Sequence, residues 1–241
     1  MNIKALILYG EGINCELETA RAFKLAGAQT IIMHVLDFLE LESLNEFDIL
    51  AFPGGFSFGD EIRSGKILAQ KIKNKQIHNI KDFIQDNKPI IGICNGFQIL
   101  TQLGVFDEDE RVEITLSENE HGSFINKWAT IEVMDQHNFW LQDLPNKIEL
   151  PIRHKEGNLN WLNKKSPRIA FRYLHDQNGS SEQTAGILNT KGNILGLMPH
   201  PEAAINNLLL PNHLNKKDQE NISLQIFKNA VNHCKGLRHA D

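Results

Sequence analysis

The feature that most constrains the fold is a regular alternation of short apolar runs with helix-like segments in the first half of the chain. The apolar runs are rich in Ile, Leu and Val, and they span residues 3–9, 30–35, 48–52 and 88–93. Such runs are typical of strands buried on both faces of a parallel sheet. Helices are predicted between them over residues 14–26, 61–73 and 78–87. The alternation predicts an α/β fold with an open, mostly parallel central sheet flanked by helices.

The second half of the chain changes character and predicts an antiparallel hairpin region. Strands are expected over residues 111–116, 127–134, 168–173 and 192–197, with turn signals such as Asn-Gly-Ser between them. Residues 218–234 carry apolar side chains four positions apart, which predicts a closing amphipathic helix. Because we find no repeat, low-complexity segment or linker, we expect one domain over residues 1–241.

Composition and charge exclude several classes of protein. Lys and Arg total 25 and Asp and Glu total 30, so the net charge is −5, which argues against binding nucleic acid or anionic lipid through bulk charge. No stretch approaches the roughly 20 apolar residues of a membrane helix. The three cysteines form no C-x-x-C pair, which is typical of a reducing compartment. We therefore expect a cytoplasmic protein with no nucleic acid and no membrane partner.

One cysteine stands where a nucleophile would be expected. Cys94 directly follows the predicted strand 88–93 and precedes a predicted helix. Gly92 and Gly96 permit a tight, strained turn that presents the thiol above the sheet edge. The helix N-terminus favours the thiolate, and the N–H of Asn95 would point at an attacked carbonyl. A lone cysteine is more often a packing residue, but this context favours catalysis.

The other two cysteines lack such a context. We expect Cys15 and Cys234 to be structural packing residues.

A histidine and a glutamate near the end of the chain form a candidate base and orienting group. His200 and Glu202 lie in a Met-Pro-His-Pro-Glu segment just beyond a predicted strand. Pro201 favours an extended conformation at His200, so the two side chains are expected to project to the same side. A rigid surface turn with two solvated side chains is the alternative. The presence of the cysteine corner favours catalysis.

A glycine-rich segment, residues 52–60, follows another predicted strand. It lacks the spacing of a Walker A phosphate-binding loop. Its glycines suit an exposed N–H that serves as a second oxyanion donor. A plain strand-to-helix turn is the alternative, because a Gly-Gly pair alone does not decide between them.

Together these segments resemble class I, triad-type glutamine amidotransferases, in which Pro-Gly-Gly, Gly-x-Cys-x-Gly-x-Gln and His-x-Glu occur in this order. The closer resemblance is to the glutaminase subunits of phosphoribosylformylglycinamidine synthase. It is carried by residues 53–60, 92–98, 178–180 and 196–202 and runs from about residue 3 to residue 204. The resemblance implies a flavodoxin-like fold. One departure is Lys155, where the family commonly has glycine in a His-Gly-Glu-Gly stretch.

The resemblance implies roles for individual residues. Cys94 would be the nucleophile, His200 the general base and then acid, and Glu202 the group that orients His200. The oxyanion hole would consist of the backbone N–H groups of Gly55 and Asn95, and Gln98 would contact the glutamine.

The function implied by the resemblance is hydrolysis of glutamine to glutamate and ammonia through a thioester on Cys94. The ammonia would pass to a large ATP-dependent synthetase subunit, which converts phosphoribosylformylglycinamide to the amidine in purine biosynthesis. A small accessory subunit is the second expected partner. No cofactor or metal is expected on this chain, since ATP and magnesium would bind the synthetase.

Three alternatives remain at this point. The first is a glutaminase subunit of another amidotransferase, with the same chemistry and a different acceptor. The second is a cysteine hydrolase of similar fold, although such enzymes place the histidine soon after the cysteine. The third is a non-catalytic binding module, although all three triad positions are filled.

Overall fold

The computed structural model describes residues 2–10, 12–55, 65–106, 114–161, 166–206, 210–211 and 222–240. Its centre is a nine-stranded sheet, whose strands in spatial order are β2 (Gln29–His34), β1 (Lys4–Tyr9), β3 (Ile49–Phe52), β4 (Ile90–Ile93), β11 (Ile194–Leu197), β10 (Thr184–Leu188), β9 (Arg168–Tyr173), β6 (Ile125–Val133) and β7 (Lys147–His154). Two further strands, β5 (Ile114–Ser117) and β8 (Asn158–Trp161), form a separate antiparallel pair.

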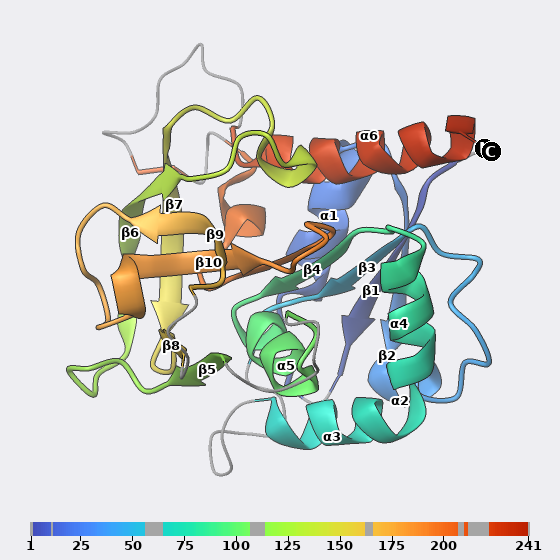
Figure 1. Cartoon of the computed structure of the whole chain (residues 1–241), viewed down its shortest axis with the longest axis horizontal. Coiled ribbons are helices and arrows are strands. Elements are labelled where there is room, and N and C mark those ends of the chain that lie inside the picture. Colours follow the sequence, from blue (N-terminus) through green and yellow to red (C-terminus); the bar gives the residue numbers. More distant parts are fainter. Residues whose placement is uncertain are drawn as a thin grey trace.

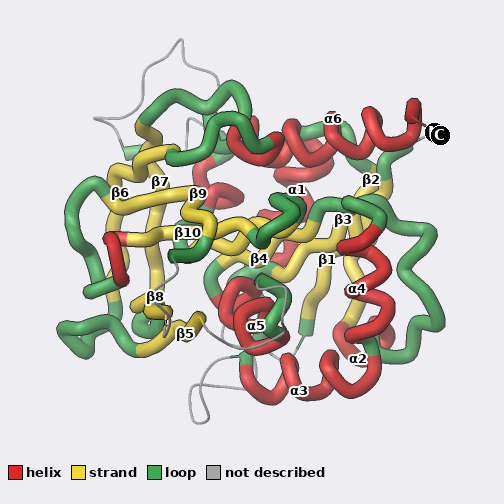
Figure 2. Tube along the Cα trace, in the orientation of Figure 1, coloured by secondary structure: helices red, strands yellow, loops and turns green. Residues whose placement is uncertain are grey.

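Helices cover both faces of the parallel part of the sheet, which comprises β2, β1, β3, β4 and β11 (Figure 1). The helices are α1 (Glu16–Leu25), α2 (Val35–Phe38), α3 (Lys66–Lys75), α4 (Ile77–Gln85), α5 (Asn95–Leu103) and α6 (Leu224–Ala240). α1 and α6 contact each other on one face, and α3 and α5 pack together on the other. Figure 2 shows the same layering of helices and strands. The predicted fold class is therefore confirmed.

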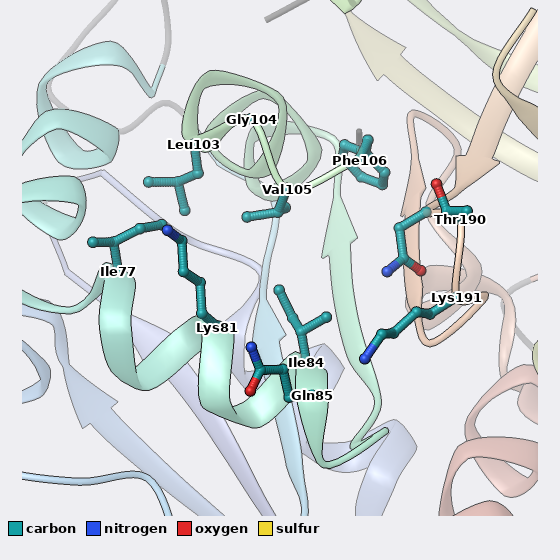
Figure 3. Close-up of a pocket in the computed structure, with 11 residues that line it drawn as sticks. Ile77, Lys81, Ile84, Gln85, Leu103, Gly104, Val105, Phe106, Thr190 and Lys191 are labelled. Carbon is teal, nitrogen blue, oxygen red and sulfur yellow. The ribbon is translucent and has the colours of Figure 1, made fainter. Parts of the chain in front are cut away.

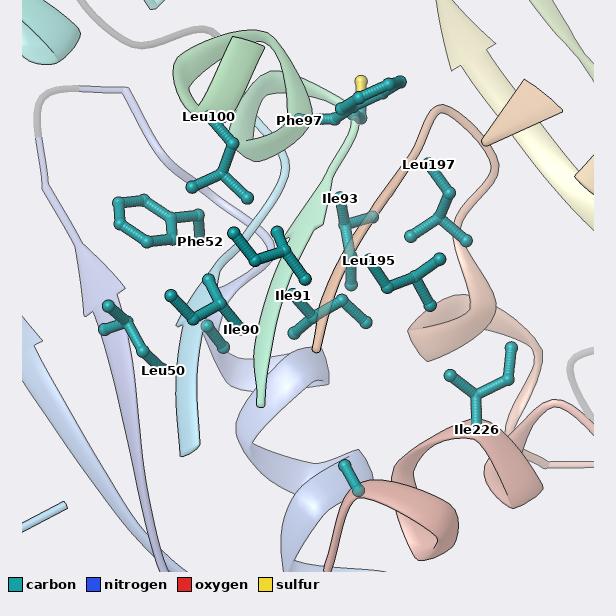
Figure 4. Close-up of a cluster of buried hydrophobic side chains, with 14 of the residues drawn as sticks. Leu50, Phe52, Ile90, Ile91, Ile93, Phe97, Leu100, Leu195, Leu197 and Ile226 are labelled. Atoms are coloured by element: carbon teal, nitrogen blue, oxygen red, sulfur yellow. The ribbon is translucent and has the colours of Figure 1, made fainter. Parts of the chain in front are cut away.

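The core includes β4 and β11, all of whose residues are buried. Figure 4 shows Phe97 and Leu100 of α5 on one side of β4 and Ile226 of α6 on the other. Burying an aliphatic or aromatic side chain of this size contributes about 1.5–3 kcal/mol. The two central strands are thus held firmly, and their carboxyl ends are well fixed.

The second half of the sheet is antiparallel, as expected. β10 and β11 form a hairpin whose turn contains Gly192 with a φ of 81°. The sequence did not predict β7, β8 or β10. β7 alternates between buried and more exposed side chains except at Pro151, which is buried. Proline is unfavourable inside a sheet. It is tolerated because β7 lies at the sheet edge.

Several predicted boundaries differ from the structure. The closing helix, expected over residues 218–234, is α6, which begins at Leu224 and continues past Cys234 to Ala240; residues 212–221 lie outside the described residues. The first helix begins at Glu16 rather than residue 14, with Cys15 at the N-cap. The predicted helix over residues 61–73 lies partly outside the described residues, and α3 begins at Lys66.

No helix built from the described residues is both long and apolar enough to cross a bilayer.

Candidate active site

The predicted site residues converge at the carboxyl ends of neighbouring parallel strands. Cys94 follows β4, His200 lies beyond β11, and Gly54 and Gly55 follow β3. The three strands are adjacent in the sheet. Open α/β sheets bind ligands at this edge.

Cys94 sits on a strained turn between β4 and α5. Its φ of 51° and ψ of −106° are rare for a residue with a side chain, and its N–H donates to the carbonyl oxygen of Leu197 at 2.8 Å. A Cβ on Gly96 would overlap the carbonyl oxygen of Phe52, and one on Gly92 would lie 2.6 Å from Leu100. Both glycines are therefore needed for α5 to begin so close to the sheet. The predicted tight turn is confirmed.

His200 and Glu202 form a buried hydrogen-bonded pair. Nδ1 of His200 lies 2.6 Å from Oε1 of Glu202, and the two residues are only 3% and 1% exposed. The expectation of an extended segment is wrong in detail, because Glu202 lies in a short 3-10 helix, Pro201–Ala204. The backbone N–H of His200 donates to the carbonyl oxygen of Pro151 on β7 at 2.9 Å. His200 is thus held in place by one hydrogen bond at its ring and another at its backbone N–H.

The electrostatic surroundings of His200 favour the protonated imidazole. Burial alone would lower its pKa, but the charge of Glu202 and the interactions with the thiols of Cys15 and Cys94 outweigh this. The pKa of His200 is consequently held well above its ordinary value. The Cys94 thiol also donates to the carbonyl oxygen of Arg153 at 3.8 Å. The arrangement has the parts of a nucleophile, a proton carrier and an orienting carboxylate.

The two predicted oxyanion donors lie on the two turns that flank Cys94 and His200. Asn95 is the first residue of α5. Gly55 has a φ of 148°, and a Cβ there would lie 2.5 Å from the carbonyl oxygen of Gly12. Residues 56–64, which include the rest of the glycine-rich segment, lie outside the described residues. The assignment of both N–H groups to an oxyanion hole stays a prediction.

Gln98 links α5 to the loop that follows β7. Its Oε1 accepts from Nδ2 of Asn95 at 3.0 Å, and its Nε2 donates to the carbonyl oxygen of Glu156 at 2.7 Å. A direct contact with glutamine stays a prediction. The side chain of Lys155 in this loop is half exposed, and its Nζ lies 3.6 Å from a carboxylate oxygen of Glu118.

His154, at the end of β7, is a buried neutral histidine beside the site. Both hydrogens of the Asn119 amide are directed at carbonyl oxygens, those of Ser123 and His154, at 2.9 Å. The Oδ1 of Asn119 therefore accepts from Nδ1–H of His154 at 3.0 Å. Burial lowers the pKa of His154 to about 3, and His200 and His121 act in the same direction.

The low pKa of His154 predicts an acid-sensitive fold. The unfolded chain binds a proton there below about pH 6.5 and the folded chain only below about pH 3, so stability falls as the pH drops through this window. In His154→Gln, the slope of unfolding free energy against pH should decrease by about 1.4 kcal/mol per pH unit near pH 5. Urea unfolding at pH 6 and pH 4.5 measures it. His78→Gln, at an exposed position on α4, should leave the slope unchanged, and an equal slope in both variants would contradict the prediction.

Cys15 is a site neighbour that the sequence did not reveal. It was expected to be a packing residue, but its thiol is half-buried and interacts with His200. A Cβ on Gly54 would lie 2.8 Å from Cε1 of His200 and 3.3 Å from Sγ of Cys15. The N–H groups of Asn14 and Cys15 both donate to the carbonyl oxygen of Gly54 at 3.2 Å. The loop after β1 therefore supports the Gly54–Gly55 turn. The one sequence signal for Cys15 was its position just beyond the end of a predicted strand. Cys234 is buried, as expected.

A separate cavity lies at the opposite edge of the sheet (Figure 3). It is lined by one face of α4, by the end of α5 with the residues that follow it, and by the β10–β11 turn, including Leu103, Val105 and Lys191. None of the predicted site residues lines it.

Comparison with known proteins identifies the family. The model for the CobB/CobQ-like glutamine amidotransferase domain matches residues 2–234. The phosphoribosylformylglycinamidine synthase subunit PurQ of Methanococcus maripaludis strain S2 is 36% identical over 95% of this chain and 96% of its own length. The PurQ subunit of Treponema denticola is 32% identical over 97% of this chain and 99% of its own length.

Solved structures agree with this result. The PurLQS structure from Thermotoga maritima includes a chain that matches with a TM-score of 0.81 and 30% identity, covering 97% of this chain and 99% of its own. A second glutamine amidotransferase from Thermotoga maritima, 17% identical with a TM-score of 0.57 over 100% of this chain and 96% of its own, shares the fold. The chain therefore belongs to the PurQ family, the glutamine amidotransferase subunits of phosphoribosylformylglycinamidine synthase.

Proposed function

We propose that this glutaminase subunit hydrolyses glutamine at Cys94 and delivers the ammonia to a synthetase subunit. The observation that carries the proposal is the buried His200–Glu202 pair, held at 2.6 Å, whose imidazole interacts with the Cys94 thiol. A thiol on a strained strand-to-helix turn beside an oriented imidazole is the arrangement of a nucleophile with its proton carrier.

The reaction begins with attack of the Cys94 sulfur on the glutamine side-chain carboxamide. The N–H groups of Gly55 and Asn95 hold the oxygen that becomes negative, and such donors contribute on the order of 10²–10³ in rate each. Transfer of the thiol proton leaves a Cys94 thiolate beside a protonated His200, which is the form that its surroundings favour, and His200 then gives this proton to the departing ammonia. Water then attacks the glutamyl thioester, with His200 as base, and glutamate leaves. Glu202 keeps the imidazole oriented and stabilises its protonated form.

Ammonia transfer explains why such a protein works in a complex. Ammonia in neutral water is largely ammonium, which has no lone pair for attack, so the acceptor enzyme must receive it directly. PurQ is one component of the PurLQS structure of Thermotoga maritima. We infer that the partners of this chain are an ATP-dependent synthetase, which binds the ATP and magnesium, together with a small accessory subunit. A cytoplasmic location stays a prediction.

Alkylation by a glutamine-mimicking electrophile tests the site. The reagent should label Cys94 stoichiometrically, with the adduct mapped by mass spectrometry, and excess glutamine should protect it. Cys15 and Cys234 are internal controls, because neither lies on the strained turn. Labelling of Cys15 in place of Cys94 would contradict the proposal.

Coupling to the partner gives a further prediction. We expect the isolated chain to release ammonia slowly and the complex to do so faster, because a bound synthetase completes the path that ammonia must follow. Steady-state glutamate formation, with and without partner subunits, measures this. Equal rates would remove the coupling but leave the glutaminase assignment intact.

A further inference from the structure

Cys15 forms a compact cluster with two groups of the proposed triad. One atom from each of Cys15, His200 and Glu202, namely a sulfur, a ring nitrogen and a carboxylate oxygen, lie within 4.8 Å of one another. The three side chains come from the loop after β1 and the segment after β11. Sulfur, imidazole and carboxylate are the ligands that zinc prefers in proteins.

A second observation also points to a ligand here. Oε2 of Glu202 is buried, yet it meets no hydrogen-bond partner among the described residues. Nε2 of His200 is likewise buried without a hydrogen bond of ordinary geometry, although the imidazole interacts with the thiols of Cys15 and Cys94. Buried polar side-chain atoms are normally paired. The cluster thus offers unsatisfied coordinating atoms on residues that are almost completely buried.

We propose that Cys15, His200 and Glu202 bind a thiophilic divalent cation, Zn²⁺, and that this ion inhibits the glutaminase. Zinc bonds of about 2.0–2.3 Å place ligand atoms roughly 3–4 Å apart. The ligand atoms of the cluster lie within 4.8 Å of one another, so a modest rearrangement meets this spacing. The side chain of Cys15 is half-buried and is the least confined of the three. Binding releases the thiol proton and the proton of the coordinated ring nitrogen to solvent, so affinity rises with pH.

Inhibition follows whichever ring nitrogen is coordinated. An ion on Nδ1 replaces the hydrogen bond to Glu202, and an ion on Nε2 occupies the position that exchanges protons with Cys94. In both cases His200 no longer carries protons, and a chelator restores activity. Metal binding itself does not rest on the proposed function, so the two can fail separately.

The test measures binding as well as activity. Zn²⁺ affinity is determined by competition with a chromophoric chelator, and Co²⁺ reports thiolate ligation through its charge-transfer band. The wild type and the control Cys234→Ser should bind one ion with equal affinity. Cys15→Ser should weaken binding by at least about 10–100-fold and lose the thiolate band. Cys94→Ala should keep both the affinity and the thiolate band, because the thiol that remains at the site in this variant, that of Cys15, is the proposed ligand.

Two outcomes would overturn the proposal. One is wild-type affinity in Cys15→Ser, and the other is loss of the cobalt band in Cys94→Ala, which would place the ion on the nucleophile. Circular dichroism of each variant shows that a lost signal does not come from unfolding.

Discussion

Cys94→Ala should lower the glutaminase rate by about 10⁴–10⁶-fold, because the proposed thioester forms on this sulfur and the residues of a catalytic triad act as a unit. The fold should be retained, since the alanine methyl group occupies part of the space of the thiol. Glutamate formation in the reconstituted complex measures the loss.

Two controls separate chemistry from folding. Cys234→Ala removes a buried thiol that donates to the carbonyl oxygen of Asp48, at the amino end of β3 and far from the triad edge, and it should leave the rate near that of the wild type. Supplying ammonia directly to the Cys94→Ala complex should restore product formation. A Cys94→Ala variant that hydrolyses glutamine at an undiminished rate would contradict the mechanism.

Gly96→Ala should destabilise the fold by about 3 kcal/mol and reduce activity at least about 100-fold. The added methyl group would overlap the carbonyl oxygen of Phe52, and overpacking against backbone is relieved only by moving α5 away from β3. Cys94 and Asn95 would move with the helix, and misplacement by about 1 Å costs on the order of 10² in rate. Thermal unfolding should show a melting temperature lower by roughly 6–12 °C.

Gly236→Ala is the matched control for that substitution. Gly236 lies inside α6, and a Cβ there would meet nothing within 4 Å. Alanine should raise the unfolding free energy by about 0.5–1 kcal/mol, because it favours the helix. Equal free energies of unfolding in the two glycine variants would contradict the prediction. They would mean that the close approach of α5 to β3 does not require glycine at position 96.

The parallel half of the sheet, the Cys94 turn and the His200–Glu202 pair could be predicted because their signals are local. Strands buried on both faces form continuous apolar runs, and Cys94 stands within a few residues of the glycines that shape its turn. His200 and Glu202 are two residues apart, so their pairing needed no knowledge of the distant chain. The interaction of His200 with the Cys94 thiol is long-range, and it followed from the rule that parallel strands end at one edge.

The features that the sequence did not predict depend on tertiary context. β7 was obscured by Pro151, whose missing N–H matters little at a sheet edge and whose carbonyl oxygen accepts from His200. Cys15 carries no local motif, and it reaches His200 only because the loop after β1 packs on Gly54. Both contacts join residues that are far apart in the chain, and no local sequence pattern indicates them.

The carboxyl end of β7 and the loop beyond it have a consequence for control of the enzyme. Three carbonyl oxygens along this stretch, those of Pro151, Arg153 and Glu156, accept from His200, Cys94 and Gln98 respectively. β7 and the loop beyond it thus fix the positions of His200, Cys94 and α5 relative to one another. A partner protein that presses on this strand from outside would shift all three together, and the glutaminase could be tuned without any contact to its substrate.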